Sequence, residues 1–203
     1  MTVKVKVCGV TRVEDARAAI AQGAALLGLN FYPRSPRYVG VDAAAEIADA
    51  VRGQVKLVGV FVNSTAEEVE ALDRQLGLDL LQFHGDESPA FIARFGGRAL
   101  PAVRWRDAGD AKHVREHNRA WGVLVERRDS VLYGGTGEAW NYAEVAEVAR
   151  GTRLLLAGGL GPDNVRAAIE AVMPWGVDVC SRIESTPGIK DMALMQRFFE
   201  EVG

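Results

Sequence analysis

Three side chains that can move protons stand directly after short apolar segments of this chain: Cys8, His84 and Glu126. A cysteine that has lost its proton is a base or a nucleophile, and a histidine can serve as an acid, a base or a ligand. A carboxyl group that ends an apolar strand is partly desolvated, which raises its pKa and suits a proton donor. We therefore take Cys8 and Glu126 as candidate catalytic residues. For His84 we favour a supporting, substrate-binding role over a catalytic one.

Each candidate catalytic residue also has a plainer interpretation. Cysteine is often buried simply as a small apolar side chain, which would explain Cys8 by packing alone. Glu126 is followed by Arg127 and Arg128, either of which would form a salt bridge with it. Asp129 follows shortly after and is an alternative proton donor. The position of Cys8 at a strand end, before glycine and threonine, favours the chemical role.

Arginines that suit an anionic ligand lie in the segment Tyr32–Tyr38. This segment contains two prolines, which stiffen a loop, together with Arg34 and Arg37. A guanidinium grips a carboxylate or a phosphate through two parallel hydrogen bonds. An exposed loop with solvated arginines is the alternative, but the prolines beside the arginines favour a ligand-binding loop.

Eight apolar segments recur along the chain, and Ala-, Glu- and Arg-rich helical patterns separate most of them. The segments are Val3–Val7, Leu26–Phe31, Leu57–Val62, Leu80–Phe83, Ala99–Val103, Gly122–Val125, Arg153–Ala157 and Gly176–Val179. Continuous apolar runs are expected of parallel strands that are covered on both faces. The pattern predicts an α/β protein with a single (β/α)8 TIM barrel domain over residues 1–203. In that architecture the chemistry lies at the C-terminal ends of the strands.

The helical patterns carry recognisable ends. Helices are predicted over Asp15–Gln22, Asp42–Arg52, Val165–Val172 and Met192–Val202. Gly23 and Gly53 suit C-terminal caps, the stretch around Thr65 suits a capped helix start, and Pro89 suits a first helical position. The helix between Val103 and Trp121 is the least well defined by the sequence.

Glycine-containing loops after the last two predicted strands suit a phosphate group. Gly158 and Gly159 follow one strand, and Ser181 and Arg182 follow the next. Barrel loops at these two places often bind phosphate through backbone N–H groups, so these four residues are candidate phosphate-binding residues. An earlier glycine cluster that includes Gly135 is a weaker signal, because a simple turn would also explain it.

Bulk properties narrow the class of protein. The 203 residues fit one domain with a sizeable core, and the net charge of −3 argues against a general nucleic-acid or anionic-membrane binder. The two cysteines, Cys8 and Cys180, form neither a disulfide framework nor a zinc motif. His113 and His117 fall on a predicted surface helix without a nearby acid to complete a metal site, so no metal is predicted. The start of the chain has no signal-peptide character and no segment is long enough to span a membrane, which favours a cytoplasmic protein.

Several ordered motifs resemble the phosphoribosylanthranilate isomerase family over essentially the whole chain. The matching segments are Lys6–Thr11, Phe31–Tyr38, Val58–Asn63, Leu81–Gly85, Tyr133–Gly137, Leu156–Gly161 and Ser185–Asp191. The resemblance implies a cofactor-free Amadori rearrangement in tryptophan biosynthesis, in which N-(5′-phosphoribosyl)anthranilate becomes 1-(2-carboxyphenylamino)-1-deoxyribulose 5-phosphate.

The resemblance also implies roles for individual residues. Cys8 matches the family's general base, and Arg37 matches the arginine that binds the anthranilate carboxylate. Glu126 stands where the family has an aspartate as general acid, and Arg182 stands where it has a glycine. Cys180 stands where serine is common, which we interpret as a small filler.

Two other functions stay open from the sequence. One is another phosphosugar isomerase or epimerase on the same barrel, which would share the phosphate loops without a clamp for an aryl carboxylate. The other is a phosphosugar-binding barrel without catalysis. We predict a small phosphorylated molecule as the partner and leave monomer and homodimer as alternatives.

Overall fold

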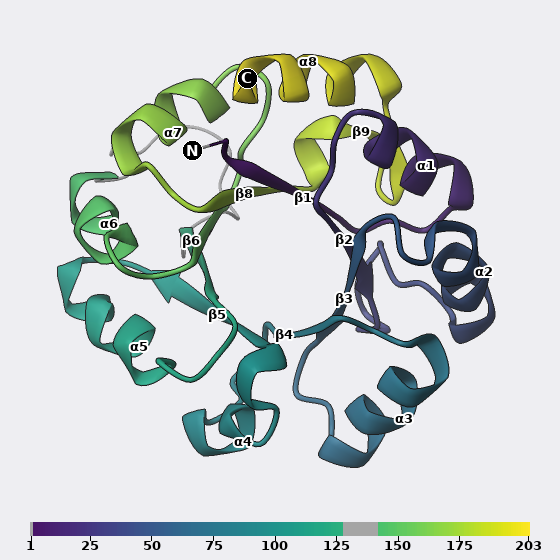
Figure 1. Cartoon of the computed structure of the whole chain (residues 1–203), viewed down its shortest axis with the longest axis horizontal. Helices are drawn as coiled ribbons and strands as arrows, with labels where there is room; N and C mark the ends of the chain where they lie inside the picture. Colours follow the sequence, from purple (N-terminus) through teal and green to yellow (C-terminus); the bar gives the residue numbers. More distant parts are fainter. Residues whose placement is uncertain (1, 128–141) are drawn as a thin grey trace.

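The computed structural model describes residues 2–127 and 142–203, and eight parallel strands in it close into a barrel. The strands are β1 (Lys4–Cys8), β2 (Leu26–Asn30), β3 (Lys56–Phe61), β4 (Leu80–Phe83), β5 (Ala99–Trp105), β6 (Val123–Arg127), β7 (Leu154–Ala157) and β8 (Gly176–Val179). They form a ring with the helices outside it (Figure 1). The predicted (β/α)8 barrel is confirmed, with strand ends that shift by one or two residues. The single domain over residues 1–203 stays a prediction.

Helices follow the strands around the outside of the barrel. They are α1 (Val13–Ala21), α2 (Val41–Val51), α3 (Ala66–Leu76), α4 (Pro89–Ala93), α5 (Ala111–Glu116), α6 (Tyr142–Ala149), α7 (Val165–Val172) and α8 (Met192–Val202). The predicted bounds of α7 and α8 are confirmed, whereas α1 begins two residues before the predicted start. Within residues 2–127 and 142–203, no helix is long and apolar enough to cross a membrane.

Shorter elements complete the connections. They are the 3-10 turns η1 (Gly96–Arg98), η2 (Ala108–Asp110) and η3 (Ser181–Ile183) and the antiparallel pair β9 (Glu184–Thr186) and β10 (Ile189–Lys190). The poorly defined stretch after Val103 resolves into the end of β5, η2 and the short helix α5. Its predicted helix is short because a turn closed by Asp107 and Asp110 takes up the first part of the segment.

Apolar side chains fill both sides of the strands. One buried cluster lies inside the barrel and consists of Leu26, Val58, Leu80, Leu100, Leu124, Leu155 and Ala157. A larger cluster, with Val7, Leu27 and Leu156 among its members, packs strands against helices. Since successive side chains of a strand point to opposite faces, burial on both faces explains why the strands are continuous apolar runs. The polar side chains of the strands therefore lie mainly at the strand ends, where they can form a functional site.

The start of α3 offers a test of local stability. The Thr65 side chain accepts from the Glu68 N–H at 3.2 Å, and the Glu68 carboxylate accepts from the Thr65 N–H at 2.8 Å. We expect Thr65→Ala to lower the free energy of unfolding by about 1 kcal/mol, because it leaves helix-terminal N–H groups without a capping partner. Urea denaturation measures the change. Ser64→Ala next to it is the matched control, and equal stability of the two variants would contradict the capping role.

Candidate active site

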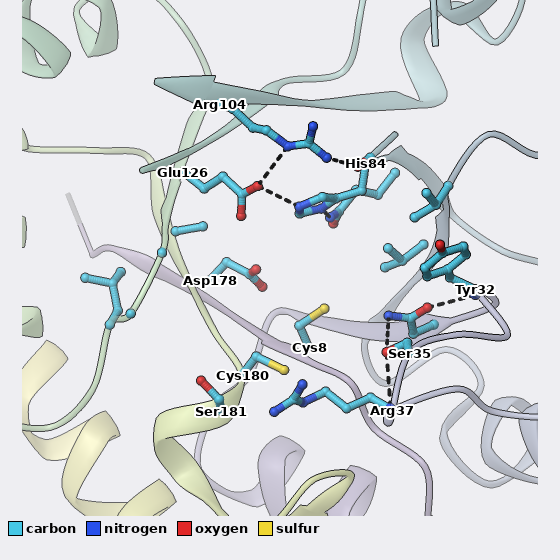
Figure 2. Close-up of a pocket in the computed structure, with 18 residues that line it drawn as sticks. Cys8, Tyr32, Ser35, Arg37, His84, Arg104, Glu126, Asp178, Cys180 and Ser181 are labelled. Carbon is cyan, nitrogen blue, oxygen red and sulfur yellow. Dashed lines mark hydrogen bonds and ion pairs between the residues drawn. The ribbon is translucent and has the colours of Figure 1, made fainter. Parts of the chain in front are cut away.

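A cavity of about 670 Å³ opens at the C-terminal ends of the strands. Such a volume suits a small-molecule ligand. The predicted site residues that line it are Cys8, Arg37, His84, Glu126, Gly158, Gly159 and Ser181 (Figure 2). The thiol and the carboxyl group therefore share one cavity, as the sequence predicts. Gly135, and the alternative donor Asp129, lie outside the described residues.

Cys8 ends β1 in surroundings that favour its ionised form. The neighbouring Cys180 thiol stabilises its negative charge, and the ammonium groups of Lys6 and Lys190 add positive charge nearby. These contacts outweigh burial and hold the pKa of Cys8 well below its usual range. The pKa of Cys180 is raised well above its usual range, chiefly because the neighbouring Cys8 sulfur stabilises its protonated form, and burial adds to the rise. The two shifts favour ionisation of Cys8 over Cys180, and the ionised thiol is the form that a base requires.

A buried ion pair lies one step below Cys8 in the barrel. Lys6 and Asp178 are register partners on β1 and β8, and the Lys6 Nζ lies 2.8 Å from Asp178 Oδ1. The Lys6 side chain is 0% exposed. Burial raises the pKa of Asp178 to about 7, although Lys6 partly offsets this effect, and the neighbouring Cys8 charge adds to the rise. The pair places a fixed positive charge under the thiol.

On the other side of the cavity, Glu126 is hydrogen-bonded to His84. His84 Nε2 lies 2.9 Å from Glu126 Oε1, and Arg104 Nε lies 3.8 Å from the same oxygen. Burial alone would raise the pKa of Glu126, but the hydrogen bond and charge of His84, with Arg104, hold that pKa below its ordinary value. The predicted rise in the pKa of Glu126 is therefore wrong. The sequence did not show that an imidazole and a guanidinium face this carboxylate.

The contact with Glu126 favours the protonated form of His84. Burial of the ring opposes its charge, yet the hydrogen bond and the negative charge of Glu126 outweigh burial and raise the pKa of His84. Gln82 Nε2 lies 2.8 Å from His84 Nδ1, and Gln82 Oε1 is buried without a hydrogen-bond partner. His84 and Glu126 therefore form a hydrogen-bonded pair at the cavity wall. The supporting role that we favour for His84 from its sequence position stays a prediction.

Arg37 is oriented by a carboxylate rather than being free in its loop. Its Nε lies 3.0 Å from both Glu184 carboxylate oxygens, and its Nη2 lies 2.7 Å from Glu184 Oε2. The loop before it is fixed by Ser35 Oγ, which accepts from the Arg37 N–H at 3.1 Å and lies 3.2 Å from Asn30 Nδ2. Arg37 reaches the cavity with its guanidinium near Cys180 and Ser181 (Figure 2). The guanidinium is thus held at the cavity wall.

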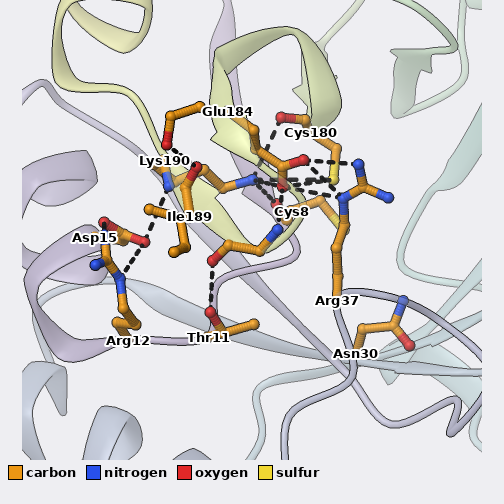
Figure 3. A network of polar contacts seen from close by, with 12 residues as sticks. Cys8, Thr11, Arg12, Asp15, Asn30, Arg37, Cys180, Glu184, Ile189 and Lys190 are labelled. Atoms are coloured by element: carbon orange, nitrogen blue, oxygen red, sulfur yellow. Dashed lines mark hydrogen bonds and ion pairs between the residues drawn. The ribbon is translucent and has the colours of Figure 1, made fainter.

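Lys190 joins the end of β10 to the ends of β1 and β8. Its Nζ donates to the Cys8 carbonyl at 2.6 Å, to the Cys180 carbonyl at 3.3 Å and to Glu184 Oε1 at 2.8 Å (Figure 3). The side chain is 0% exposed. Together Lys190 and Arg37 outweigh the effect of burial and hold the pKa of Glu184 below its usual value.

The glycine loop after β7 has backbone that only glycine adopts readily. Gly158 has φ 93° and Gly159 has φ 69°, and a Cβ at Gly158 would lie 3.0 Å from the Arg127 nitrogen. Both glycines and Ser181 line the cavity. Arg182 is directed elsewhere, since its Nη2 lies 2.6 Å from Asp163 Oδ1 and its side chain is not among those lining the cavity. Phosphate binding by these residues stays a prediction.

Three charged residues in or beside the site escape sequence analysis as site residues. Lys6 and Asp178 each precede a cysteine by two positions, so charged residues spaced by two on buried strands are the signal that would have found them. Lys190 has no such signal, because a hairpin distant in sequence brings it to Cys8. Among the described residues, no three His, Cys, Asp or Glu side chains are placed to hold one metal ion. His113 pairs instead with Glu116, with Nδ1 and Oε2 3.2 Å apart.

Comparisons with known proteins agree on one family. The family model described as N-(5′-phosphoribosyl)anthranilate (PRA) isomerase matches residues 5–201. An N-(5′-phosphoribosyl)anthranilate isomerase of Rubrobacter xylanophilus is 45% identical over 199 residues, which cover 96% of each chain.

Solved structures agree with these matches. The phosphoribosylanthranilate isomerase of Thermotoga maritima has a TM-score of 0.90 at 32% identity, covering 98% of both chains. Monomers generated from that dimeric enzyme have a TM-score of 0.86 at 30% identity and the same coverage. An isomerase of this kind in complex with reduced 1-(o-carboxyphenylamino)-1-deoxyribulose 5-phosphate has a TM-score of 0.88 at 30% identity, covering 98% of both chains.

Proposed function

The chain belongs to the N-(5′-phosphoribosyl)anthranilate isomerase family, and we propose that Cys8 and the pair of His84 and Glu126 perform its proton transfers. The reaction is the Amadori rearrangement of tryptophan biosynthesis, from N-(5′-phosphoribosyl)anthranilate to 1-(2-carboxyphenylamino)-1-deoxyribulose 5-phosphate. The observation that carries the assignment of residues is the shared cavity, with a thiolate on one wall and a proton-holding pair on the other.

The first step opens the furanose ring. A proton passes to the ring oxygen, the bond between that oxygen and C1′ breaks, and the nitrogen lone pair forms a protonated Schiff base. His84 Nε2 lies 2.9 Å from Glu126 Oε1, so a protonated His84 delivers the proton either directly or through the carboxyl group. A carboxylate with a lowered pKa is a poor proton donor alone, and the charged histidine supplies the proton that the carboxylate lacks.

The second step moves the double bond. The Cys8 thiolate removes the C2′ proton, and the electrons of that bond flow toward the iminium nitrogen to give an enolamine. Tautomerisation then gives the ketone. Because the protonated Schiff base accepts the electrons, the mechanism requires no metal and no cofactor. Lys6 and Lys190 keep the thiol ionised before the substrate proton is taken.

Two groups of residues at the mouth suit the two anionic ends of the substrate. The phosphate rests on the backbone of the loop at Gly158 and Gly159 and beside Ser181, where helix-terminal and turn N–H groups suit an anion. The anthranilate carboxylate takes the remaining N–H groups of Arg37, which Glu184 keeps in place. The reacting carbons then lie between the thiol and the acid pair.

Arg37→Lys tests the carboxylate site. We expect KM for the anthranilate substrate to rise about 10-fold with little change in kcat, because an ammonium cannot make the two parallel hydrogen bonds of a guanidinium. Steady-state kinetics measure both constants. Arg34→Lys in the same loop is the matched control, since Arg34 is exposed and does not line the cavity. An unchanged KM in Arg37→Lys would leave the carboxylate without its proposed partner.

The activity itself is tested with purified protein by following the fluorescence of the anthranilate substrate, which is consumed. Complementation of a tryptophan auxotroph lacking this isomerase is a second test. Binding of a reduced product analogue without any turnover would contradict the enzyme and support a binding protein.

We further infer that the partner of this protein is a small phosphorylated molecule and not a nucleic acid, in line with a net charge of −3. A cytoplasmic location and a choice between monomer and homodimer are part of the same proposal. Light scattering of the purified protein separates the two oligomeric states, and fractionation of cells tests the location.

A further inference from the structure

Cys8 and Cys180 occupy neighbouring positions on adjacent strands. β1 and β8 are paired in parallel from Lys4 with Gly176 to Val7 with Val179. Cys8 directly follows Val7, and Cys180 directly follows Val179. Neighbouring strands lie about 4.8 Å apart, which falls within the range of about 4.4–6.8 Å between the Cα atoms of a disulfide. Both side chains line the same cavity (Figure 2). The spacing of the two strands therefore permits a covalent bond between the two sulfur atoms.

The two sulfur atoms are chemically unequal. The pKa of Cys8, which lies beside Lys6, is lowered well below its usual range, whereas that of Cys180 is raised well above it. Lys190 donates to the carbonyl groups of both cysteines and lies 4.0 Å from Cys180 Sγ. A thiolate next to fixed cations reacts readily with peroxides, and a second thiol beside it resolves the product.

Small oxidants can reach the pair from solvent. Both cysteines are partly exposed rather than buried, and the cavity they line is open at the mouth of the barrel. A cysteine kept only for packing is usually fully buried and inert. This placement distinguishes Cys180 from the small filler that we expect from the sequence.

We propose that Cys8 and Cys180 are a modification site at which a hydroperoxide forms a reversible disulfide within one chain. The consequence that this bond stops catalysis rests on the proposed function of Cys8 as the base. The disulfide itself does not depend on that role.

The chemistry balances with one hydroperoxide for each pair of thiols. The Cys8 thiolate attacks the peroxide, the O–O bond breaks, and a sulfenic acid forms while the released oxygen leaves as water or alcohol. The Cys180 sulfur then attacks the Cys8 sulfur, the S–O bond breaks, and hydroxide leaves as water with the Cys180 proton. Two thiols are oxidised by two electrons, and the hydroperoxide is reduced by the same two.

The experiment treats the purified full chain with hydrogen peroxide and compares it with Cys180→Ser. In the unsubstituted protein we expect both thiols to disappear, the intact mass to fall by two hydrogens, and dithiothreitol to restore thiols and activity. A serine at position 180 cannot complete the bond, so Cys180→Ser is expected to gain oxygen and to react with dimedone. After prolonged peroxide treatment this variant is expected to lose activity that dithiothreitol does not restore. Each protein is compared with its own untreated sample.

Three results would overturn the proposal. They are retention of both thiols, oxygen addition without loss of two hydrogens, and a cross-link between two chains on a non-reducing gel. Cys8→Ser is a second variant, in which the remaining thiol of Cys180 is expected to resist peroxide because it lacks the thiolate partner. A disulfide that forms while turnover continues would support the modification site and refute Cys8 as the base, so the two proposals fail separately.

Discussion

Cys8→Ala is expected to lower kcat about 10²- to 10⁴-fold, the range that a positioned general base contributes. The variant removes the group that takes the C2′ proton but leaves the phosphate loop and Arg37 in place. Binding of the reduced product analogue should therefore change by no more than about threefold. The fluorescence assay measures turnover, and calorimetric titration measures binding.

Cys180→Ala provides the control for this variant. It keeps the base but removes the neighbouring thiol that lowers the pKa of Cys8, so that pKa should rise. Since the thiolate is the active form, activity is lost as pH falls through that pKa, and the acid limb of kcat/KM should move to higher pH in Cys180→Ala. Normal turnover in Cys8→Ala would remove Cys8 from the mechanism.

Glu126→Gln is expected to lower kcat/KM about 100-fold, since it breaks the pair that holds the proton for ring opening. The neutral amide also removes the charge that raises the pKa of His84, and burial then lowers that pKa. The required form of His84 is protonated, so activity is lost as pH rises through its pKa. The alkaline limb of the profile of kcat/KM against pH should therefore move to lower pH.

The control for this substitution is Glu116→Gln on the surface. Glu116 also lies beside a histidine, His113, but far from the cavity lining, and its profile should match that of the unsubstituted protein. An unchanged alkaline limb and rate in Glu126→Gln would exclude the pair as the acid. In that case Asp129→Asn tests the alternative donor.

The strands of this protein could be predicted because their burial on both faces appears in the sequence as uninterrupted apolar runs. Leu80–Phe83 and Gly176–Val179 are examples whose predicted bounds agree with the structure. The closed order of the strands follows from their number and from the helices between them. The same regularity placed Cys8, His84 and Glu126 at the mouth, since each stands where an apolar run stops.

The electrostatics of the site could not be predicted in the same way. The direction of the pKa shift of Glu126 depends on His84, which follows β4, and on Arg104, which lies on β5. Composition shows that these residues exist but not that they converge on one oxygen. Arg182 illustrates the reverse, because its position suits a phosphate loop whereas its guanidinium pairs with Asp163.

Lys190 and Cys8 are separated by 182 residues, yet the Lys190 ammonium donates to the Cys8 carbonyl. During translation the thiol leaves the ribosome first, and its cation follows only when nearly all of the sequence shown has emerged. β1 must also wait for β8, its neighbour in the closed barrel. A product of early termination that stops before residue 190 therefore lacks the ammonium contact to Cys8.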